Sequence, residues 1–174
     1  MSNNTISRRT FLKLSGGSVA ATAAAISHPV SAAPTATPDT SHTVLPYPRK
    51  AVAVVGQLTQ GAPLQFSYPD AASPCVAVKL GNAAPGGVGP NRDIVAFSMM
   101  CTHMGCPVAF DAGTNIFKCG CHYSMFDAEK GGQMIAGQAT ENLPRILLSY
   151  DEKSGRITAT GIEGMLYGRQ ANVL

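Results

Sequence analysis

Two short segments hold most of the residues in this chain that can bind metals or carry out redox chemistry. They contain four of the five cysteines and two of the four histidines of the 174-residue chain. Their sequences are Cys101-Thr102-His103-Met104-Gly105-Cys106 and Cys119-Gly120-Cys121-His122. The 15 residues from 104 to 118 separate His103 from Cys119, which is enough for a two-stranded excursion that brings the segments together. The pattern therefore predicts one centre built from thiol and imidazole side chains.

Three chemistries use such a set of side chains. Zinc takes thiolate and imidazole ligands in tetrahedral geometry. A disulfide framework uses the cysteines and does not need the histidines. A 2Fe–2S cluster of the Rieske kind has two thiolates on one iron and two imidazoles on the other. The residue types alone leave all three open, and only the last would make the chain a one-electron carrier.

The spacing of these residues resembles that of the Rieske iron–sulfur family. The shared pattern is Cys-x-His, 15 residues, then Cys-x-x-His, with an additional cysteine in each segment. The resemblance implies one 2Fe–2S cluster with four protein ligands, and a disulfide that an oxidising compartment permits. The implied ligands are Cys101 and Cys119 on the buried iron, and His103 and His122 on the outer iron. The implied disulfide joins Cys106 and Cys121.

Residues after the second segment are expected to tune the reduction potential. Two neutral imidazoles in place of thiolates remove negative charge and favour the reduced cluster, which raises the potential. In high-potential relatives, a Ser at the position of Ser124 donates a hydrogen bond to a bridging sulfide, and a Tyr commonly stands where this chain has Phe126. Ser124 matches and Phe126 departs, so we predict an intermediate potential. The loop at 137–144 lies where the family places a proline-containing loop over the cluster.

A more extended resemblance, from the leader to the last residues, is to the small subunit of arsenite oxidase. The matching stretches beyond the two segments are residues 73–81, 85–91, 126–130, 137–145 and 167–173. This resemblance implies a large molybdopterin subunit that oxidises arsenite to arsenate, in a heterodimer or a larger assembly. This chain would be the non-catalytic subunit that passes electrons one at a time to cytochrome c or a small copper protein. The alternatives are a Rieske subunit of a membrane quinol–cytochrome c oxidoreductase and a structural zinc module.

The N-terminal segment has the features of an export signal. The pair Arg8-Arg9 is followed by Phe-Leu-Lys, and residues 14–26 form a short, mildly apolar stretch. Small residues at 30–32 are typical of a signal peptidase site. The segment predicts a twin-arginine signal peptide at residues 1–32 and a periplasmic protein. Contact with a membrane is expected only if this leader is retained.

The rest of the chain is expected to form a linker and one domain. A Pro/Ser/Thr-rich linker covers residues 33–48, and a Rieske domain covers residues 49–174, with cluster-binding loops at about 99–144. The chain has a net charge of +3. The leader contains three bases and no acid, namely Arg8, Arg9 and Lys13. The remainder is therefore neutral, which argues against a nucleic acid as partner.

Short apolar or alternating segments bounded by turn residues predict an all-β fold. Strands are expected at residues 50–55, 64–68, 75–80, 93–100, 115–118, 145–150 and 156–160. After the leader, no apolar helical repeat persists for about ten residues. Together with the Rieske resemblance, this indicates an antiparallel β sandwich or barrel with a small inserted cluster-binding subdomain. Cys75, at the start of one strand, is expected to be a buried, small apolar residue.

Overall fold

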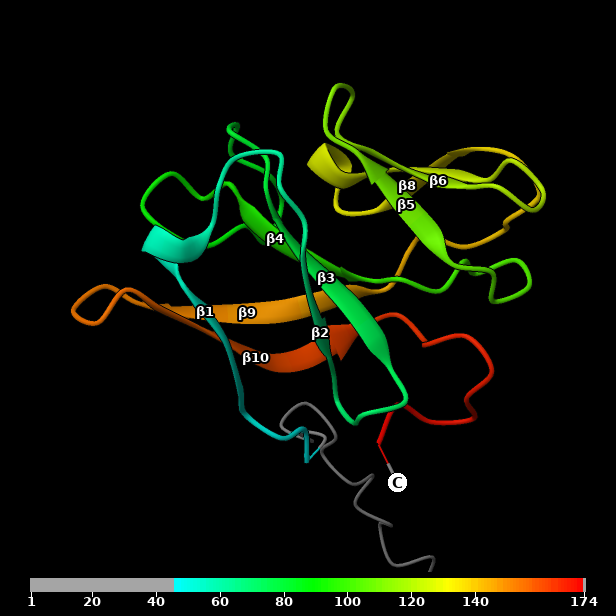
Figure 1. The fold of residues 1–174 in the computed structure, drawn as a ribbon. Coiled ribbons are helices and arrows are strands. Elements are labelled where there is room, and N and C mark those ends of the chain that lie inside the picture. Colours follow the sequence, from blue (N-terminus) through cyan, green and yellow to red (C-terminus); the bar gives the residue numbers. More distant parts are fainter. Residues whose placement is uncertain (1–45, 174) are drawn as a thin grey trace, which may run out of the picture. The chain divides into compact units, whose positions relative to one another are not determined.

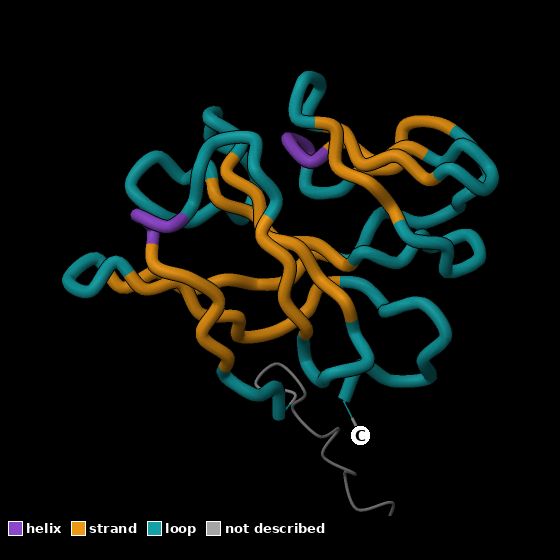
Figure 2. Tube along the Cα trace, viewed as in Figure 1, coloured by secondary structure: helices purple, strands orange, loops and turns teal. Residues whose placement is uncertain are grey.

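Strands and single helical turns make up the regular elements of the computed structural model. The structure describes residues 46–173, so the predicted signal peptide and most of the linker lie outside the described residues. The strands are β1 (Lys50–Val54), β2 (Leu64–Ser67), β3 (Pro74–Lys79), β4 (Ile94–Ser98), β5 (Val108–Asp111), β6 (Ile116–Cys119), β7 (Met125–Asp127), β8 (Gln133–Ala136), β9 (Arg145–Asp151) and β10 (Arg156–Glu163) (Figure 1). The helical turns are η1 (Val55–Gln57) and η2 (Ala128–Lys130) (Figure 2). Within residues 46–173, no helix is long and apolar enough to cross a membrane.

Six strands form a larger, near-closed antiparallel sheet in the order β1-β10-β9-β4-β3-β2. Its strand β4 is buried at every position, because both of its faces are covered. Successive side chains of a strand point to opposite faces, and Ala96 accordingly packs in one core while Val95 and Phe97 pack in another. A strand covered on both sides reads as a continuous apolar run, which explains why the sequence predicts this element well.

The centre of interest lies in a second sheet that is inserted into the first. The chain leaves the larger sheet after β4 and returns with β9, where Phe97 pairs with Arg145. Between them β5, β6, β7 and β8 form a four-stranded antiparallel sheet, drawn above β9 in Figure 1. Phe97 of the larger sheet meets Phe117 of β6 edge-on, with ring centroids 5.4 Å apart. The all-β fold with a small inserted subdomain is thereby confirmed.

The seven strands predicted from the sequence all coincide with strands of the structure. The three additional strands, β5, β7 and β8, all belong to the inserted subdomain and span only three or four residues each. Such segments are too short for an alternating pattern to be recognised. Strand β10 continues to Glu163 rather than ending at Thr160, past an irregularity in the pairing between Ala159 and Gly161.

Candidate metal centre

The first cysteine–histidine segment forms a closed loop between β4 and β5. The backbone N–H of Cys101 donates to the carbonyl oxygen of Cys106 (2.8 Å), and the N–H of Gly105 donates to that of Cys101 (2.9 Å). Gly105 has a φ of +71°, in the left-handed region that glycine adopts at little cost. These features turn the chain back on itself and place His103 in the turn.

The second segment forms the loop between β6 and β7. Cys119 ends β6, and its N–H donates to the carbonyl oxygen of Ser124 (2.9 Å), which closes this loop as well. Tyr123 has a φ of +59° and turns the chain next to the exposed His122. Strands β5 and β6 are paired, with Val108 opposite Cys119. The two loops therefore emerge from the same end of one hairpin, which is the two-stranded excursion predicted from the spacing.

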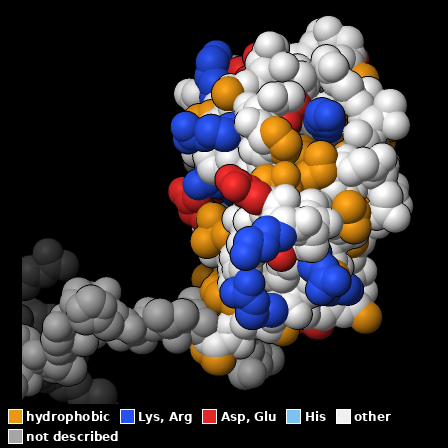
Figure 3. Space-filling model, turned by 90° about the vertical axis from the view of Figure 1, so that its left-hand side faces the viewer, with side chains coloured by type: hydrophobic (Ala, Val, Ile, Leu, Met, Phe, Trp, Pro, Cys, Tyr) orange, Lys and Arg blue, Asp and Glu red, His pale blue; other side chains and the backbone are white. Residues whose placement is uncertain are grey.

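The two histidines meet where these loops come together. His103 Nδ1 lies 3.2 Å from His122 Nδ1. The rings are nearly perpendicular, at 88°, and their centroids are 4.7 Å apart. Two ring nitrogens that converge in this way can each direct a lone pair at one metal group. No histidine of the described residues is visible on the face shown in Figure 3, so the rings of His103 and His122 lie on another side of the surface.

Two free thiols, Cys101 and Cys119, lie in the core shared by the two sheets. Their residues are only 1% and 3% exposed. Burial raises the pKa of the Cys101 thiol, a hydrogen bond from the His103 backbone opposes that rise, and the adjacent Cys119 adds to it. A thiol buried in this way is readily ionised once a metal cation offsets the cost of the charge. The donor set thus fits a metal group with two thiolate and two imidazole ligands.

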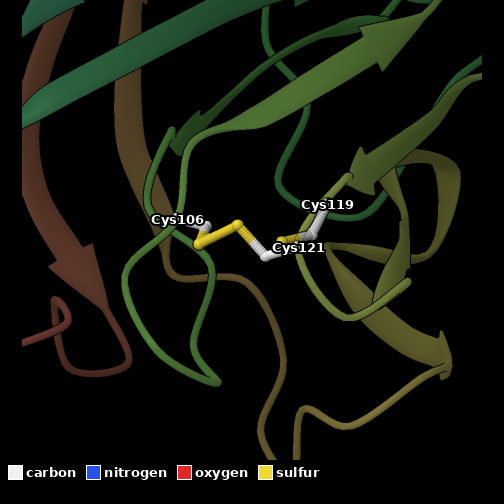
Figure 4. Close-up of side chains that lie close together, drawn as sticks. All are labelled: Cys106, Cys119 and Cys121. Atoms are coloured by element: carbon white, nitrogen blue, oxygen red, sulfur yellow. A yellow bond between two sulfur atoms is a disulfide. The ribbon is translucent and has the colours of Figure 1, made fainter.

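The remaining two cysteines of the segments link the loops covalently. Cys106 and Cys121 form a disulfide with Cα atoms 6.5 Å apart (Figure 4), the pairing that the Rieske resemblance implies. Cys119 Sγ lies within 4.8 Å of both disulfide sulfurs. Because those sulfurs are bonded to each other, only Cys119 of the three keeps a thiol that can bind a metal.

The proline-containing loop that was predicted to lie over the cluster contacts both cysteine–histidine loops. Thr102 Oγ1, in the first, donates to the carbonyl oxygen of Glu141 (2.9 Å). Ser124 Oγ, in the second, accepts hydrogen bonds from the backbone N–H groups of Gln138 (3.1 Å) and Ala139 (3.0 Å). Sequence reasoning missed the contribution of Thr102, since a threonine beside a ligand carries no signal of its own.

Ser124 is fully buried and has one proton to donate. Its oxygen already accepts two N–H groups, and its hydroxyl hydrogen-bonds to Cys101, which lowers the pKa of that thiol. Phe126 is also fully buried, in the shared core beside Phe117, and has no hydroxyl to donate. Of the two side-chain donors typical of high-potential relatives, the serine is therefore present as Ser124. The tyrosine is replaced by Phe126, which contributes only apolar packing.

Two apolar side chains next to the histidines are exposed. Met104 and Tyr123 are 59% and 75% exposed, so the loops that carry the histidines also present apolar surface.

Cys75 is fully buried in the larger sheet, and burial raises the pKa of its thiol to about 12. The prediction that Cys75 acts as a small apolar residue is confirmed.

Comparisons with known proteins agree with this geometry. The family model of the Rieske [2Fe-2S] domain matches residues 49–147. The soluble domain of the Rieske protein II (soxF) from Sulfolobus acidocaldarius superposes with a TM-score of 0.60 at 30% identity, covering 67% of this chain and 78% of that one. The fold and the ligand pattern thus point to the same family.

Relatives differ in how much of the chain they resemble. The iodate reductase subunit IdrB of Denitromonas iodatirespirans is 38% identical over 173 residues, which cover 96% of this chain and 86% of that protein. The Rieske iron–sulfur subunit of the cytochrome bc1 complex of Corynebacterium diphtheriae is 41% identical over 70 residues, which cover 40% of this chain and 17% of that subunit. The similarity to the bc1 subunit is therefore partial, whereas that to the iodate reductase subunit spans nearly the whole chain.

Proposed function

Since this chain belongs to the Rieske [2Fe-2S] domain family, we propose that it is the electron-transfer subunit of an exported molybdopterin enzyme of the arsenite oxidase type. The observation that carries the electron-transfer role is the pair of imidazole nitrogens 3.2 Å apart in loops that reach the surface, close in sequence to two buried thiols. An electron carrier needs its redox group near the surface, where a partner can approach it. This arrangement meets that requirement.

The chain binds one Rieske 2Fe–2S cluster. We assign its protein ligands as Cys101, Cys119, His103 and His122. When bound, the cluster supplies a site that takes up and releases one electron at a time. The chain's own residues do the rest: the disulfide and the proline-containing loop hold the ligand loops, and the shared aromatic core keeps water away from the thiols.

Arsenite is the proposed substrate of the partner subunit, on the strength of the sequence stretches that resemble the arsenite oxidase small subunit. Oxidation of arsenite to arsenate releases an electron pair, and this chain would forward those electrons singly to cytochrome c or a small copper protein.

Iodate reduction is the second candidate, because the similarity to the iodate reductase subunit covers 96% of this chain. The same centre would serve with the electrons running the other way, from a donor through this chain to the large subunit. The two candidates therefore differ in the direction of electron flow rather than in the construction of the centre.

Electron paramagnetic resonance on the native complex, purified through this subunit, separates the candidates. We expect arsenite, added anaerobically to the oxidised complex, to produce the signal of the reduced Rieske cluster. If iodate instead removes that signal from the reduced complex after all dithionite has been removed, and arsenite never produces it, the second candidate replaces the first. If neither compound changes the signal in a complex that contains molybdenum, both substrate assignments fail while the family assignment stands.

Export by the twin-arginine route is proposed from the leader alone. A fusion of residues 1–32 to a reporter that is secreted only when folded should reach the periplasm. Replacing Arg8 and Arg9 by lysine should abolish its export, because both arginines are read by the translocation machinery. Export of the lysine variant at the wild-type level would contradict the proposal.

A further inference from the structure

The segment after β10, residues 164–173, is fastened to the larger sheet by polar contacts. Arg169 forms an ion pair with Asp70 (2.7 Å) and donates to Ser73 Oγ (2.7 Å), both in the turn between β2 and β3. These contacts lie far from the ligands in the sequence. Figure 1 shows the segment, in red, on the same side of the unit as the loop between β4 and β5.

Asn172 holds the segment together from within. It is 8% exposed. Its Oδ1 accepts from the backbone N–H of Leu166 (2.9 Å), and its Nδ2 donates to the carbonyl oxygen of Gly164 (2.7 Å) and to Tyr47 Oη (3.1 Å). Leu166 packs in the core of the larger sheet. The backbone on both sides of residue 167 is therefore fixed.

From this fixed segment the ring of Tyr167 packs directly against the first cluster loop. A Cβ atom added to Gly105 would lie only 2.5 Å from Tyr167 Cδ1 and Cε1. The loop and the ring are therefore in such close contact that no side chain fits between them. Gly105 stands two positions after His103 in the tightly closed loop, so displacement of its backbone would move that histidine.

The same loop is held at two other points. Thr102 donates to the proline-containing loop at the carbonyl oxygen of Glu141, and Cys106 is tied to the second loop by its disulfide with Cys121. Both of these supports come from the inserted subdomain or its return loop. The contact with Tyr167 is different, because it connects the ligand loop to the larger sheet through the C-terminal segment.

We propose that Tyr167 is a positioning residue for His103: its ring clamps the backbone at Gly105 and so fixes the imidazole on the outer iron. The effect acts through packing. The ring atoms make the contact, so a phenylalanine should serve as well as the tyrosine. The proposal depends on cluster binding and not on which substrate the partner subunit uses.

The first test compares Tyr167→Ala with Tyr167→Phe in the purified, cluster-loaded chain. With Tyr167→Ala we expect a broadened paramagnetic resonance spectrum of the reduced cluster, because His103 occupies a wider range of orientations. We also expect the visible absorbance to be lost about tenfold faster when a chelator is added. This ratio of rates corresponds to about 1.4 kcal/mol in the free-energy barrier to cluster loss. Tyr167→Phe should match the wild type in both. An unaltered spectrum with Tyr167→Ala, or equal damage from Tyr167→Phe, would overturn the proposal.

A double-mutant cycle provides the second test. Gly105→Ala should broaden the spectrum and hasten cluster loss, through strain at positive φ and through the clash with Tyr167. In the double variant Gly105→Ala/Tyr167→Ala the clash is gone, so the combined loss should be clearly smaller than the sum of the single effects. Additive effects on the rate of cluster loss would show that the ring and the loop do not act on each other, which contradicts the proposal.

Discussion

The larger sheet and the inserted subdomain are stabilised in different ways. In the larger sheet, strands of four to eight residues pack on each other, and β4 is buried throughout. In the subdomain, the strands are three or four residues long, and the loops that carry the ligands are closed by a disulfide, backbone hydrogen bonds and residues at positive φ. The larger sheet has two apolar cores of its own. The subdomain packs on a core that it shares with the larger sheet, and covalent and polar links hold it in addition.

The proposed metal centre thus lies in the inserted subdomain, which has less hydrophobic core of its own than the larger sheet. The proposed histidine ligands must reach the surface, so they cannot come from the middle of a buried strand and lie in loops. The larger sheet contributes by supplying a rigid base, through Phe97 under the subdomain and, in our proposal, through Tyr167 beside the ligand loop. Substitutions should therefore affect cluster properties or fold stability according to the region they fall in.

The largest contrast is expected between two buried cysteines, one from each region. Cys119→Ser removes a proposed ligand, so the purified chain should lack the Rieske spectrum and contain little or no iron. Cys75→Ala, the matched control in the larger sheet, removes another buried free thiol that lies outside the two cysteine–histidine segments. It should keep full iron content and the wild-type spectrum. Iron analysis and visible absorbance measure both. A cluster retained by Cys119→Ser would remove this residue from the ligand set.

Removal of the disulfide should separate the stabilities of the two regions. The bridge spans 15 positions in the sequence, for which the loop-closure estimate is about 3 kcal/mol. In the double variant Cys106→Ala/Cys121→Ala, amide hydrogens of β5 to β8 should exchange faster, while those of β3 and β4 keep their protection. Hydrogen exchange measured by mass spectrometry gives the amide exchange rates of both sheets in one experiment. Equal acceleration in the two sheets would show that they unfold as one unit, against our comparison.

Loss of the buried hydroxyl beside Cys101 should change the potential. Because the backbone N–H groups of Gln138 and Ala139 also lose their acceptor, a loss of thermal stability is expected as well. Ser124→Ala removes the hydroxyl that donates a hydrogen bond towards the proposed cluster. The reduced cluster loses this stabilisation, so the oxidised form is favoured and the midpoint potential falls. A decrease of about 60 mV is expected, which corresponds to a tenfold change in the redox equilibrium. Protein-film voltammetry measures it, with Ser149→Ala on β9 as a control that should leave the potential unchanged. A potential that does not fall would show that the hydroxyl has no influence on the cluster.

A hydroxyl added at Phe126 tests why the potential should be intermediate. Phe126→Tyr places the donor that is common in high-potential relatives, and it should raise the midpoint potential by less than about 60 mV. The fully buried site leaves little room, so a small loss of thermal stability is expected as well. An unchanged or lowered midpoint potential would contradict the role that we assign to this position.

The smallest effect is expected from a surface ion pair of the subdomain. The hydrogen bond from Lys118 lowers the pKa of Asp111 below its ordinary value of 3.8. Since the pKa is lower in the folded state, the pair stabilises the fold above about pH 4, and this contribution is lost as the pH falls through the folded-state pKa. Asp111→Asn should therefore lower the melting temperature slightly at pH 7, and by a smaller amount as the pH falls below about 4, whereas Glu152→Gln should have no effect at any of these pH values. A difference that does not decrease as the pH falls would exclude this electrostatic origin.

The larger sheet and the identity of the centre could be predicted from the sequence, for two distinct reasons. Strands such as β3 and β4 contain runs of four apolar residues, 75–78 and 94–97, so they can be recognised without any knowledge of the tertiary structure. The ligand pattern is local, with each cysteine close in sequence to its histidine. The strands β5, β7 and β8 were missed because a segment of three or four residues can adopt several structures, and its neighbours in space determine which.

The contacts that hold the ligand loops could not be predicted, because they join distant parts of the chain. The hydrogen bond from Thr102 to Glu141 and the packing of Tyr167 on Gly105 depend on the final arrangement of loops. A glycine and a tyrosine more than sixty positions apart give no sign in the sequence that they touch. Local sequence patterns thus identify the residues proposed to bind the cluster, whereas the tertiary structure identifies the residues that position them.

The central claim is that two imidazoles and two thiols of these loops hold one cluster, and pulsed paramagnetic resonance tests it most directly. The reduced protein would be prepared with ¹⁵N only in its histidines, and His42→Gln would exclude the third histidine that remains after the predicted leader. Our account predicts couplings to two histidine nitrogens, and the loss of one of them in His122→Cys. A cluster without coupling to histidine nitrogen, or the same two couplings in His122→Cys, would contradict the assignment of the centre.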